Sequence, residues 1–410
     1  MVFVSREWKN TEVGVIPVDW EVNQIQEIGD VVGGGTPKTT IEDYWNGDIS
    51  WITPKDLSNH SGRYVFKGER SITKRGLDNS SAKIIPKGTI LFSSRAPIGY
   101  LAIAGKDMCT NQGFKSIVCN EKKANNIFLY YLMMIKRYEL ENIAGGSTFK
   151  EVSGKIVKEF KIQVPPLEEQ KAIANILSTL DEKIEANNQI NKKLEEMAQT
   201  IFKHWFIDFE FPNENGEPYK SSGGEMIESE LGMIPKGWEV GILSNLIEIT
   251  SGKRPAKKSE SKDESFIFPL IGASSIMGYS EDYNFNEQVL VIGRVGTHGV
   301  VQRFNRKIWA SDNTLIIKSK AYEYIYQILN AIDYSALNRG STQPLITQTD
   351  IKNYSVLIPV SEILEKYEKL IGSIFFLHSN KCDENEKLNY LRDTLLPKLM
   401  SGEIRVPIDN

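Results

Sequence analysis

The sequence is poor in the residues that build metal centres and disulfide frameworks. It contains 3 cysteines and 4 histidines among 410 residues. Cys109, Cys119 and Cys382 form no Cys-x-x-Cys pair, and their odd number argues against a disulfide framework, so we expect reduced, structural thiols. The histidines are scattered, with no HExxH motif and no carboxylate at metal-ligand spacing, so no metal site is expected.

Long hydrophobic runs are absent too. No apolar stretch approaches the roughly 20 residues that a membrane span needs. The start, MVFVSREWKN, lacks the apolar core of a secretory signal, and we therefore expect a cytoplasmic protein. A composition of 40% hydrophobic and 25% charged residues excludes a disordered or fibrous chain. The length is enough for two or three ordinary domains.

Signatures of common cofactor and catalytic sites are also missing. GYLAIAGKD has five residues between Gly99 and Gly105, and Asp107 follows Lys106, whereas a Walker A loop needs four residues and then Ser or Thr after its lysine. GGGTPK lacks the third glycine of a dinucleotide fingerprint. No GxSxG nucleophile elbow is present, nor the Asn/Asp-Pro-Pro-aromatic motif of an adenine methyltransferase. We predict a chain that is not itself an enzyme.

What the sequence does contain is a repeat of its whole half-length. GVIPVDWEV at residues 14–22 returns 218 residues later as GMIPKGWEV. At the same offset, Gly34 and Pro37 of GGGTPK correspond to Gly252 and Pro255 of SGKRPAK. GTILFSSRAPIG then resembles QVLVIGRVGTHG, which we align with Arg95 opposite Arg294, and GGSTFK matches RGSTQP at an offset of 194. Such self-similarity predicts two copies of one domain.

Each copy ends in a helical pattern with apolar residues at steps of three and four. In the first copy it runs from Ile173 to Trp205, with Asn187 and Asn191 in the middle of the seam, and the second copy keeps the register. An antiparallel coiled coil would set Asn187 against Asn385 and Asn191 against Lys381, so that polar layers meet and fix the register. The alternative is two ordinary amphipathic helices that pack on separate domains.

The fold class that follows is α+β, because short β-branched runs alternate with turns and a few helical stretches such as FLYYLMMIKRYEL and YIYQILNAIDY. We expect two repeated globular α+β domains separated by two long helices, which form an antiparallel coiled coil with pseudo-two-fold symmetry. The predicted boundaries are a first domain at 1–165, a spacer helix at 166–211, a linker at 212–231, a second domain at 232–359, and a distal spacer helix with a tail at 360–410.

Charge is partitioned along the chain. The net charge of −4 argues against a nucleic-acid binder when taken whole. Residues 14–165, however, carry 20 basic and 16 acidic side chains, and residues 232–359 carry 14 and 12. The acidic excess lies in the helices and the linker. Basic domains suit contacts with phosphates, although an excess this small also arises by chance.

Several longer phrases resemble the specificity (S) subunits of type I restriction-modification systems over nearly the full length. They are IPxxW at the start of both copies, YWNGDISWITPKDL, IPKGTILFSSRAPIGYLAIA, VPPLEEQKAIANIL, IDFEFPNENGEPYKSSGGEM and LLPKLMSGEIRV. The resemblance implies two target-recognition domains, each of which reads one half of an asymmetric, split target in double-stranded DNA. It also implies that the helices dock two methyltransferase (M) subunits, and that restriction/translocase (R) subunits can join.

The resemblance further implies that this chain carries no cofactor. S-adenosylmethionine, ATP and Mg²⁺ are expected on the partner subunits. A spacer helix of about 34 residues is about 50 Å long, which would set the half-site centres roughly 10 to 15 base pairs apart. A runner-up from another class is a coiled-coil scaffold with two protein-binding modules, for which no salt-dependent DNA affinity is expected.

Candidate DNA-binding residues are those that can donate to or accept from base edges, or bind phosphates, near the repeated loops. Positions that are the same in both copies can serve either the fold or DNA binding. Positions that differ between the copies are the better candidates for reading bases, because the two half-sites differ. They are Lys55, Gln112, Thr297, His298 and Gln343. The first domain offers Thr36, Lys38, Lys55, Ser94, Arg95, Asn111, Gln112, Ser147, Thr148 and Lys150. The second offers Lys253, Arg254, Lys257, Arg294, Thr297, His298, Asp312, Asn313, Arg339, Ser341, Thr342 and Gln343.

Candidate partner-binding residues are sought on the outward faces of the two helices. They are Glu168, Glu169, Gln170, Lys192, Glu195, Phe202 and Trp205 in the first helix, and Tyr390, Arg392 and Leu396 in the second. For Trp205 and its neighbour Phe206, packing at the helix end is the favoured alternative to exposure.

Overall fold

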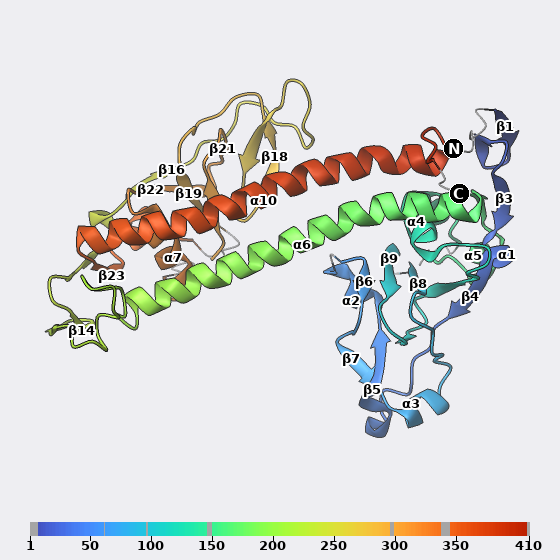
Figure 1. The fold of residues 1–410 in the computed structure, drawn as a ribbon, viewed down its shortest axis with the longest axis horizontal. Coiled ribbons are helices and arrows are strands. Elements are labelled where there is room, and N and C mark those ends of the chain that lie inside the picture. The colour runs from blue at the N-terminus through green and yellow to red at the C-terminus, as the bar shows by residue number, and fades with distance from the viewer. Residues whose placement is uncertain are drawn as a thin grey trace. The chain divides into compact units, whose positions relative to one another are not determined.

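The computed structural model describes residues 7–60, 62–95, 97–145, 150–295, 299–337 and 345–407. The chain forms two compact units. The first unit consists of Met1–Gln189 together with Cys382–Asn410, and the second unit of Ile190–Lys381. Each unit therefore contains one α+β domain and one half of each long helix, α6 (Leu167–Phe206) and α10 (Ser361–Ser401). Both helices are continuous (Figure 1).

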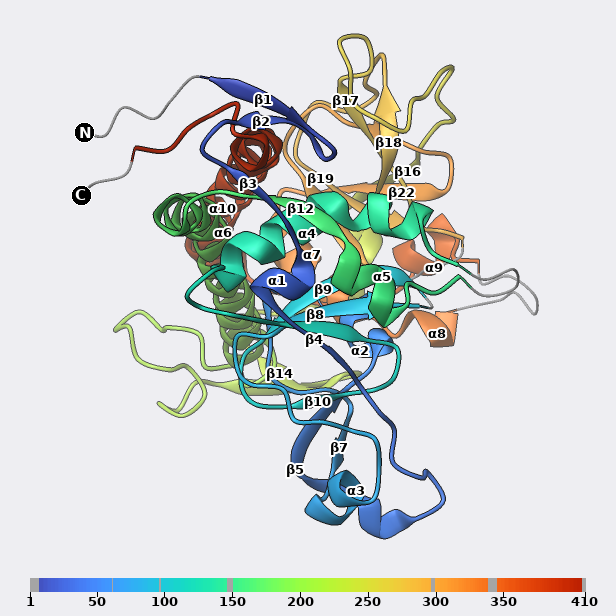
Figure 2. The ribbon, with the colours of Figure 1, turned by 90° about the vertical axis from the view of Figure 1, so that its right-hand side faces the viewer.

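In the first unit, a five-stranded sheet has the order β4-β11-β8-β9-β6. Helix α4 (Asn126–Asn142) packs on β8 and β9 (Figure 2). Its apolar residues form one core with those strands and with α6. A smaller sheet has the order β10-β5-β7 and its own cluster around Trp45 and Trp51. The strands of the two sheets are β4 (Gly29–Gly33), β5 (Trp45–Ile52), β6 (Tyr64–Val65), β7 (Arg70–Ile72), β8 (Ile90–Ser94), β9 (Ile98–Ala104), β10 (Cys109–Thr110) and β11 (Lys115–Cys119).

Shorter elements complete the first unit. Two-stranded ladders join β1 (Trp8–Thr11) to β2 (Gly14–Pro17) and β3 (Glu21–Gln24) to β12 (Lys161–Val164). The remaining helices are α1 (Ile25–Ile28), η1 (Glu42–Tyr44), α2 (Pro54–Ser58), α3 (Lys74–Asp78) and α5 (Gly154–Glu159). The capping box at Thr53 starts α2, because Asp56 accepts from both the backbone and the hydroxyl of Thr53.

The second unit repeats this plan. Its sheets have the orders β16-β22-β19-β20 and β18-β17-β21, and two ladders join β13 to β14 and β15 to β23. The strands are β13 (Met226–Ser229), β14 (Gly232–Pro235), β15 (Glu239–Ile242), β16 (Glu248–Ser251), β17 (Phe268–Ile271), β18 (Ile276–Ser280), β19 (Val289–Gly293), β20 (Val301–Phe304), β21 (Trp309–Ala310), β22 (Thr314–Lys318) and β23 (Ser355–Ile358). The helices are η2 (Leu243–Asn245), α7 (Tyr322–Ala331), α8 (Tyr334–Leu337) and α9 (Gln348–Lys352). The predicted α+β class with two repeated domains is confirmed.

The two long helices run antiparallel with the predicted register. In the first unit, the amide of Asn187 donates to Oδ1 of Asn385 at 2.9 Å. Towards the C-terminal end of α10, Arg392 binds Asp181 at 2.9 Å. In the second unit, the imidazole of His378 lies 3.0 Å from the carboxylate of Glu195. Residue numbers thus fall along one helix as they rise along the other, and the polar layer at Asn187 lies where the sequence places it.

Where each helix ends, the chain folds back onto the tryptophan of the IPxxW motif. Glu210 N donates to His204 O after α6, and Ile404 N donates to Lys398 O after α10, so Phe211 and Arg405 are equivalent. In the second unit, Phe211 stacks on Trp238 with centroids 5.1 Å apart, and Tyr219 stacks on Phe211 at 4.6 Å. Phe211, placed at the end of the predicted spacer helix, thus lies beyond the end of α6, and the predicted linker at 212–231 contributes Tyr219 to the stack and includes part of strand β13.

In the first unit, ion pairs occupy the equivalent position. Arg405 donates to both oxygens of Glu169, at 2.7 and 2.8 Å, and to Asp19 at 2.6 Å. The indole of Trp20 donates to Glu169 at 3.0 Å. Glu169 is completely buried. A buried carboxylate is tolerated because a bidentate guanidinium and an indole N–H satisfy it.

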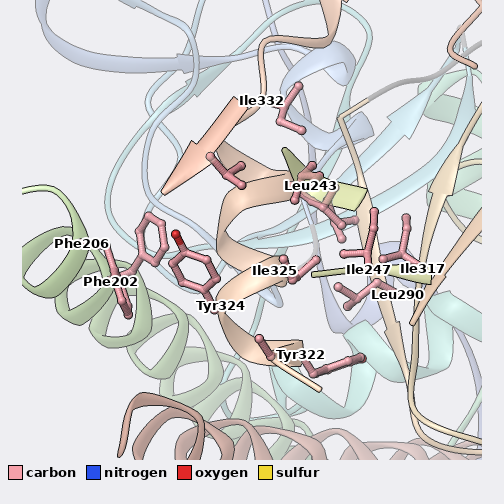
Figure 3. Packing of buried hydrophobic residues seen from close by; sticks show 14 of the residues in the cluster. Phe202, Phe206, Leu243, Ile247, Leu290, Ile317, Tyr322, Tyr324, Ile325 and Ile332 are labelled. Atoms are coloured by element: carbon pink, nitrogen blue, oxygen red, sulfur yellow. The ribbon is translucent and has the colours of Figure 1, made fainter. Parts of the chain in front are cut away.

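The core of the second unit gathers aromatic rings from α6 and α7 (Figure 3). Tyr367 and Phe375 of α10 belong to the same cluster. Phe206 lies 4.6 Å from Tyr324 and 4.7 Å from Tyr367, measured between ring centroids. Phe202 joins them at 5.9 Å from Tyr324. Trp205 is also buried in this core, as the packing alternative for the helix end predicted.

Glu368 of α10 caps the N-terminus of α7 inside the second unit. Its two oxygens accept from the backbone N–H groups of Glu323 and Tyr324, both at 2.9 Å. Burial raises the pKa of Glu368 to about 7, and the nearby carboxylate of Glu323 raises it further. The two backbone hydrogen bonds and Arg303 lower this pKa, but their effect is smaller. The folded unit thus holds this proton more tightly than the unfolded chain does.

We expect the second unit to lose stability as the pH rises from about 4.5 to about 7. The stabilisation from Glu368 is complete below its unfolded pKa near 4.5 and is lost as the pH rises through the folded pKa near 7, a change of about 3 kcal/mol. Glu368→Gln should remove this slope. The measurement is urea unfolding at pH 5 and pH 8, followed by hydrogen exchange in peptides of α7 because the chain has two units, with Glu365→Gln on the exposed surface of α10 as the matched control. Equal slopes in wild type and Glu368→Gln would contradict the prediction.

Candidate functional site

The glycine-rich loop after β4 lies against the loop after β10 in the first unit. Gly35 N donates to Thr110 O at 2.9 Å. A Cβ added at Gly34 would lie 2.1 Å from Asn111 O and 2.3 Å from Thr110 O, so no other residue fits without moving backbone. The glycine is required by this close approach of two loops.

A third segment joins them at the end of β8. Ser94 N donates to Gly113 O at 2.7 Å, and Val152 N donates to Ser94 O at 2.9 Å. Beside this frame, Glu151 lies 3.1 Å from the ammonium of Lys115 and 3.7 Å from the guanidinium of Arg95. The site is thus a set of loops locked to one another by backbone hydrogen bonds, with charged side chains at its border.

The second unit builds the same frame. Lys253 N donates to Ala310 O at 3.0 Å, and a Cβ at Gly252 would lie 2.1 Å from Ser311 O. Arg294 N donates to Asn313 O, and Ile346 N donates to Arg294 O, both at 3.0 Å. Each bond has its counterpart in the first unit.

These bonds correct the pairing of two positions across the repeat. Arg294 occupies the place of Ser94 and not that of Arg95, because both donate to the loop that precedes the next strand. The ladders agree, since Ile90 pairs with Ile117 and Leu290 with Ile317. The offset here is therefore 200 throughout, and matching the two arginines by identity was wrong by one residue. The same shift sets Gln112 opposite Asp312.

Two tryptophans that the sequence reasoning passed over hold the glycine loops. The indole of Trp51 in β5 donates to Gly35 O at 2.8 Å, and that of Trp309 in β21 donates to Lys253 O at 2.7 Å. The strands that carry the two tryptophans, β5 and β21, are not equivalent. In the repeat, β5 corresponds to β17 and β10 corresponds to β21, and each domain pairs its two strands in parallel. An alignment of the halves could not match these residues, although each copy has a tryptophan on the parallel pair beside the loop.

Most candidate residues of the first domain surround this frame. Thr36 and Gln112 meet across the two loops, where the hydroxyl of Thr36 donates to Oε1 of Gln112. Lys38 and Lys150 are exposed, and Lys55 is exposed but pairs with Glu69 at 2.9 Å. Ser94 is buried and Arg95 and Asn111 are half-buried. The candidates Ser147 and Thr148 lie outside the described residues.

In the second domain, the exposed candidates are Lys253, Arg254, Lys257, Asp312 and Asn313, and Lys257 pairs with Glu281 at 3.2 Å. Arg294 is half-buried. The remaining candidates lie outside the described residues, namely Thr297, His298, Arg339, Ser341, Thr342 and Gln343.

Half of the candidate partner-binding residues do not lie on an outward face. They are buried because each packs within its own unit: Glu169, Gln170, Phe202, Trp205 and Leu396. Glu195 and Arg392 are half-buried and contact the other long helix, where Glu195 lies beside His378 and Arg392 pairs with Asp181. Only Glu168, Lys192 and Tyr390 are exposed, and Tyr390 is 76% exposed. The role of these residues in docking stays a prediction.

Sequence reasoning also missed Phe376 of α10, which is 70% exposed while its neighbour Phe375 is buried. No signal in the sequence separates this ring from Phe375, because consecutive aromatic residues of one helix can both be buried, as Trp205 and Phe206 are.

The chemistry available at the loops is that of binding. Among the described candidates, the exposed groups are amides, ammonium groups, one guanidinium group and one carboxylate. Among the described residues, no group of three or more His, Cys, Asp or Glu is placed to hold a metal ion. Within the same part of the chain, no helix is long and apolar enough to cross a membrane.

Comparisons with known proteins match this repeated plan. A family model described as "Type I restriction modification DNA specificity domain" matches residues 17–196 and 235–391, one match in each half. The type I restriction enzyme MjaIX specificity subunit of Methanocaldococcus jannaschii is 38% identical over 98% of this chain and 97% of its own length. The HindI specificity subunit of Haemophilus influenzae is 25% identical, covering 80% of this chain and 89% of its own.

A solved structure has the same fold. It is the S subunit of a type I restriction-modification system from M. genitalium, with a TM-score of 0.63 at 17% identity, over 93% of this chain and 96% of that one.

Proposed function

The chain belongs to the specificity subunits of type I restriction-modification systems, which are not catalytic themselves. From this premise we propose that each of its two domains reads one half of a bipartite, asymmetric DNA target. One observation carries the proposal. The same locked loop frame occurs in both domains, yet the exposed side chains on it differ, with Gln112 in one and Asp312 in the other. A shared frame with different polar side chains is what reading two different half-sites requires.

The exposed cations near both frames support contacts with DNA phosphates. Lys38 and Lys150 lie in the first domain, and Lys253, Arg254 and Lys257 in the second. Phosphate contacts hold a protein in register on the duplex, and they make its affinity fall with salt.

The test is a map of methylated bases in DNA from cells that carry the partner methyltransferase, with and without this chain. We expect methyladenine within a single split sequence, and its loss when the chain is absent. Methylation that is indifferent to the chain would overturn the proposal and leave the scaffold function.

We further propose that the helices dock two methyltransferase subunits, and that restriction subunits join the complex. S-adenosylmethionine, ATP and Mg²⁺ would then be held by those partners, in the cytoplasm. The lengths of α6 and α10, 40 and 41 residues, correspond to about 60 Å of helix each. At about 3.4 Å per base pair this length spans about 18 base pairs, which is longer than the spacing of roughly 10 to 15 base pairs expected from the sequence, and the spacing of the half-sites stays a prediction.

We propose that the exposed ring of Phe376 is one of the docking contacts on α10. Phe376→Ala should weaken binding of the methyltransferase subunit roughly 30-fold, because burial of a phenylalanine side chain is worth about 2 kcal/mol. Titration calorimetry with the purified partner would measure this. The matched control is Phe66→Ala, a phenylalanine of the first domain that is 58% exposed. Equal affinities for the two variants would exclude Phe376 from the interface.

A further inference from the structure

We propose that one cross-loop pair in each domain selects a base pair: Thr36 with Gln112 in the first domain, and Arg254 with Asp312 in the second. The inference rests on the function proposed above and deepens it. It assigns the pair in the first domain to an A·T base pair and the pair in the second domain to a G·C base pair.

The two pairs occupy the same place in the two frames. Gly34 and Gly252 are each pressed against the carbonyls of the opposite loop, which makes residues 36 and 254 equivalent. Ser94 N binds Gly113 O as Arg294 N binds Asn313 O, which makes residues 112 and 312 equivalent. Neither alignment depends on the side chains that are compared.

Several other candidates near the frame are already engaged in hydrogen bonds or ion pairs within their own domain. Ser94 is buried, and its hydroxyl donates to Gly113 O at 3.1 Å. Asn111 accepts from Gly113 N at 2.9 Å and so shapes the turn. Lys55 pairs with Glu69, and Arg95 lies near Glu151. Gln112, Arg254 and Asp312, by contrast, are exposed on loops whose backbones are fixed. A base reader needs this combination of a rigid backbone and an accessible polar end.

In the first domain, the contact between the pair orients the glutamine. The Thr36 hydroxyl donates to Oε1 of Gln112 and fixes which end of the amide carries the donors. This contact uses one lone pair of Oε1, and the exposed side chain keeps its Nε2 donors and the second lone pair of Oε1 for a ligand. Adenine offers an N7 acceptor and an N6 donor in the major groove, which together match a glutamine amide.

In the second domain, the same two places carry opposite charges. A guanidinium at residue 254 matches O6 and N7 of guanine, and a carboxylate at residue 312 accepts from N4 of cytosine. An isolated carboxylate would be repelled by the phosphates, and Arg254, on the facing loop, offsets that charge. The pair therefore has the donors and acceptor that distinguish a G·C base pair.

The decisive experiment exchanges the pairs in the full chain, expressed with its methyltransferase partner, and maps the methylated sequence. Thr36→Arg with Gln112→Asp should convert one A·T pair of the first half-site to G·C and leave the second half-site unchanged. Arg254→Thr with Asp312→Gln should convert one G·C pair of the second half-site to A·T. Gln26→Asp, an exposed change in the same domain away from the loops, is the matched control and should leave the target unaltered.

If an exchanged chain is inactive, the single variant Gln112→Ala decides. Its methylation should discriminate at one base pair at least tenfold less than wild type, with unchanged discrimination elsewhere. A wild-type target, kept by Gln112→Ala and by every active exchange, would overturn the assignment of the pair but leave the proposed function standing. Loss of the function itself would be recognised separately, since wild-type methylation would not depend on the chain.

Discussion

Replacement of Arg405 by methionine is expected to lower the free energy of unfolding of the first unit by about 3 to 5 kcal/mol. The substitution removes the partner of a fully buried carboxylate, Glu169, while keeping most of the apolar stem. Asp19 loses its partner as well. Hydrogen exchange of the peptides that contain Trp20 would measure the effect, since the chain has two units and a single unfolding transition cannot be assumed.

The control for this prediction comes from the second unit, where the places of Glu169 and Arg405 are taken by Ile363 and Phe211. Glu169→Ile combined with Arg405→Phe transplants that apolar pair. Because apolar residues of similar volume often replace a buried ion pair at little cost, the double variant should be more stable than Arg405→Met. A double variant as unstable as the single one would mean that the loss reflects altered packing and not an unpaired carboxylate.

Gly34→Ala is expected to abolish reading of the first half-site. The new methyl group would overlap the carbonyls of Thr110 and Asn111, and the two loops would have to separate. Overpacking of this kind costs typically about 1 to 3 kcal/mol, and here the strain falls on the loops that carry Thr36 and Gln112. We expect at least a tenfold loss of methylation at the target, measured with the full complex.

Gly33→Ala is the matched control, because a Cβ at Gly33 meets nothing within 4 Å. It makes the same chemical change one residue earlier and should leave methylation at the wild-type level. If both variants behave alike, the close approach at Gly34 has no functional role.

The sequence predicted the features that depend on periodicity. The repeat predicted two domains of one plan, and the steps of three and four predicted both long helices and the meeting of Asn187 with Asn385. The β-branched runs predicted the central strands. These features follow from the side-chain pattern of each element alone.

Features that depend on neighbours from distant parts of the chain were missed. Glu169 was expected on an outward face of the first helix, but it is buried against Arg405, which lies more than 200 residues away in sequence. Trp51 and Trp309 hold equivalent loops from strands that are not equivalent, so no alignment of the halves relates them. Arg294 was set against Arg95 because they share an identity, whereas the backbone ladder sets it against Ser94.

The division of the chain has a consequence for its synthesis on the ribosome. The second unit is one uninterrupted stretch, Ile190–Lys381, whereas the first unit also needs Cys382–Asn410. A growing polypeptide emerges from its N-terminus at about 5 to 20 residues per second, and domains usually fold in that order. In this chain, the second unit has all its residues before the first unit does, which is the reverse of that order. Until residue 405 has been synthesised, Glu169 lacks its guanidinium partner, so the nascent first domain exposes an acidic group at the place where Arg405 later binds.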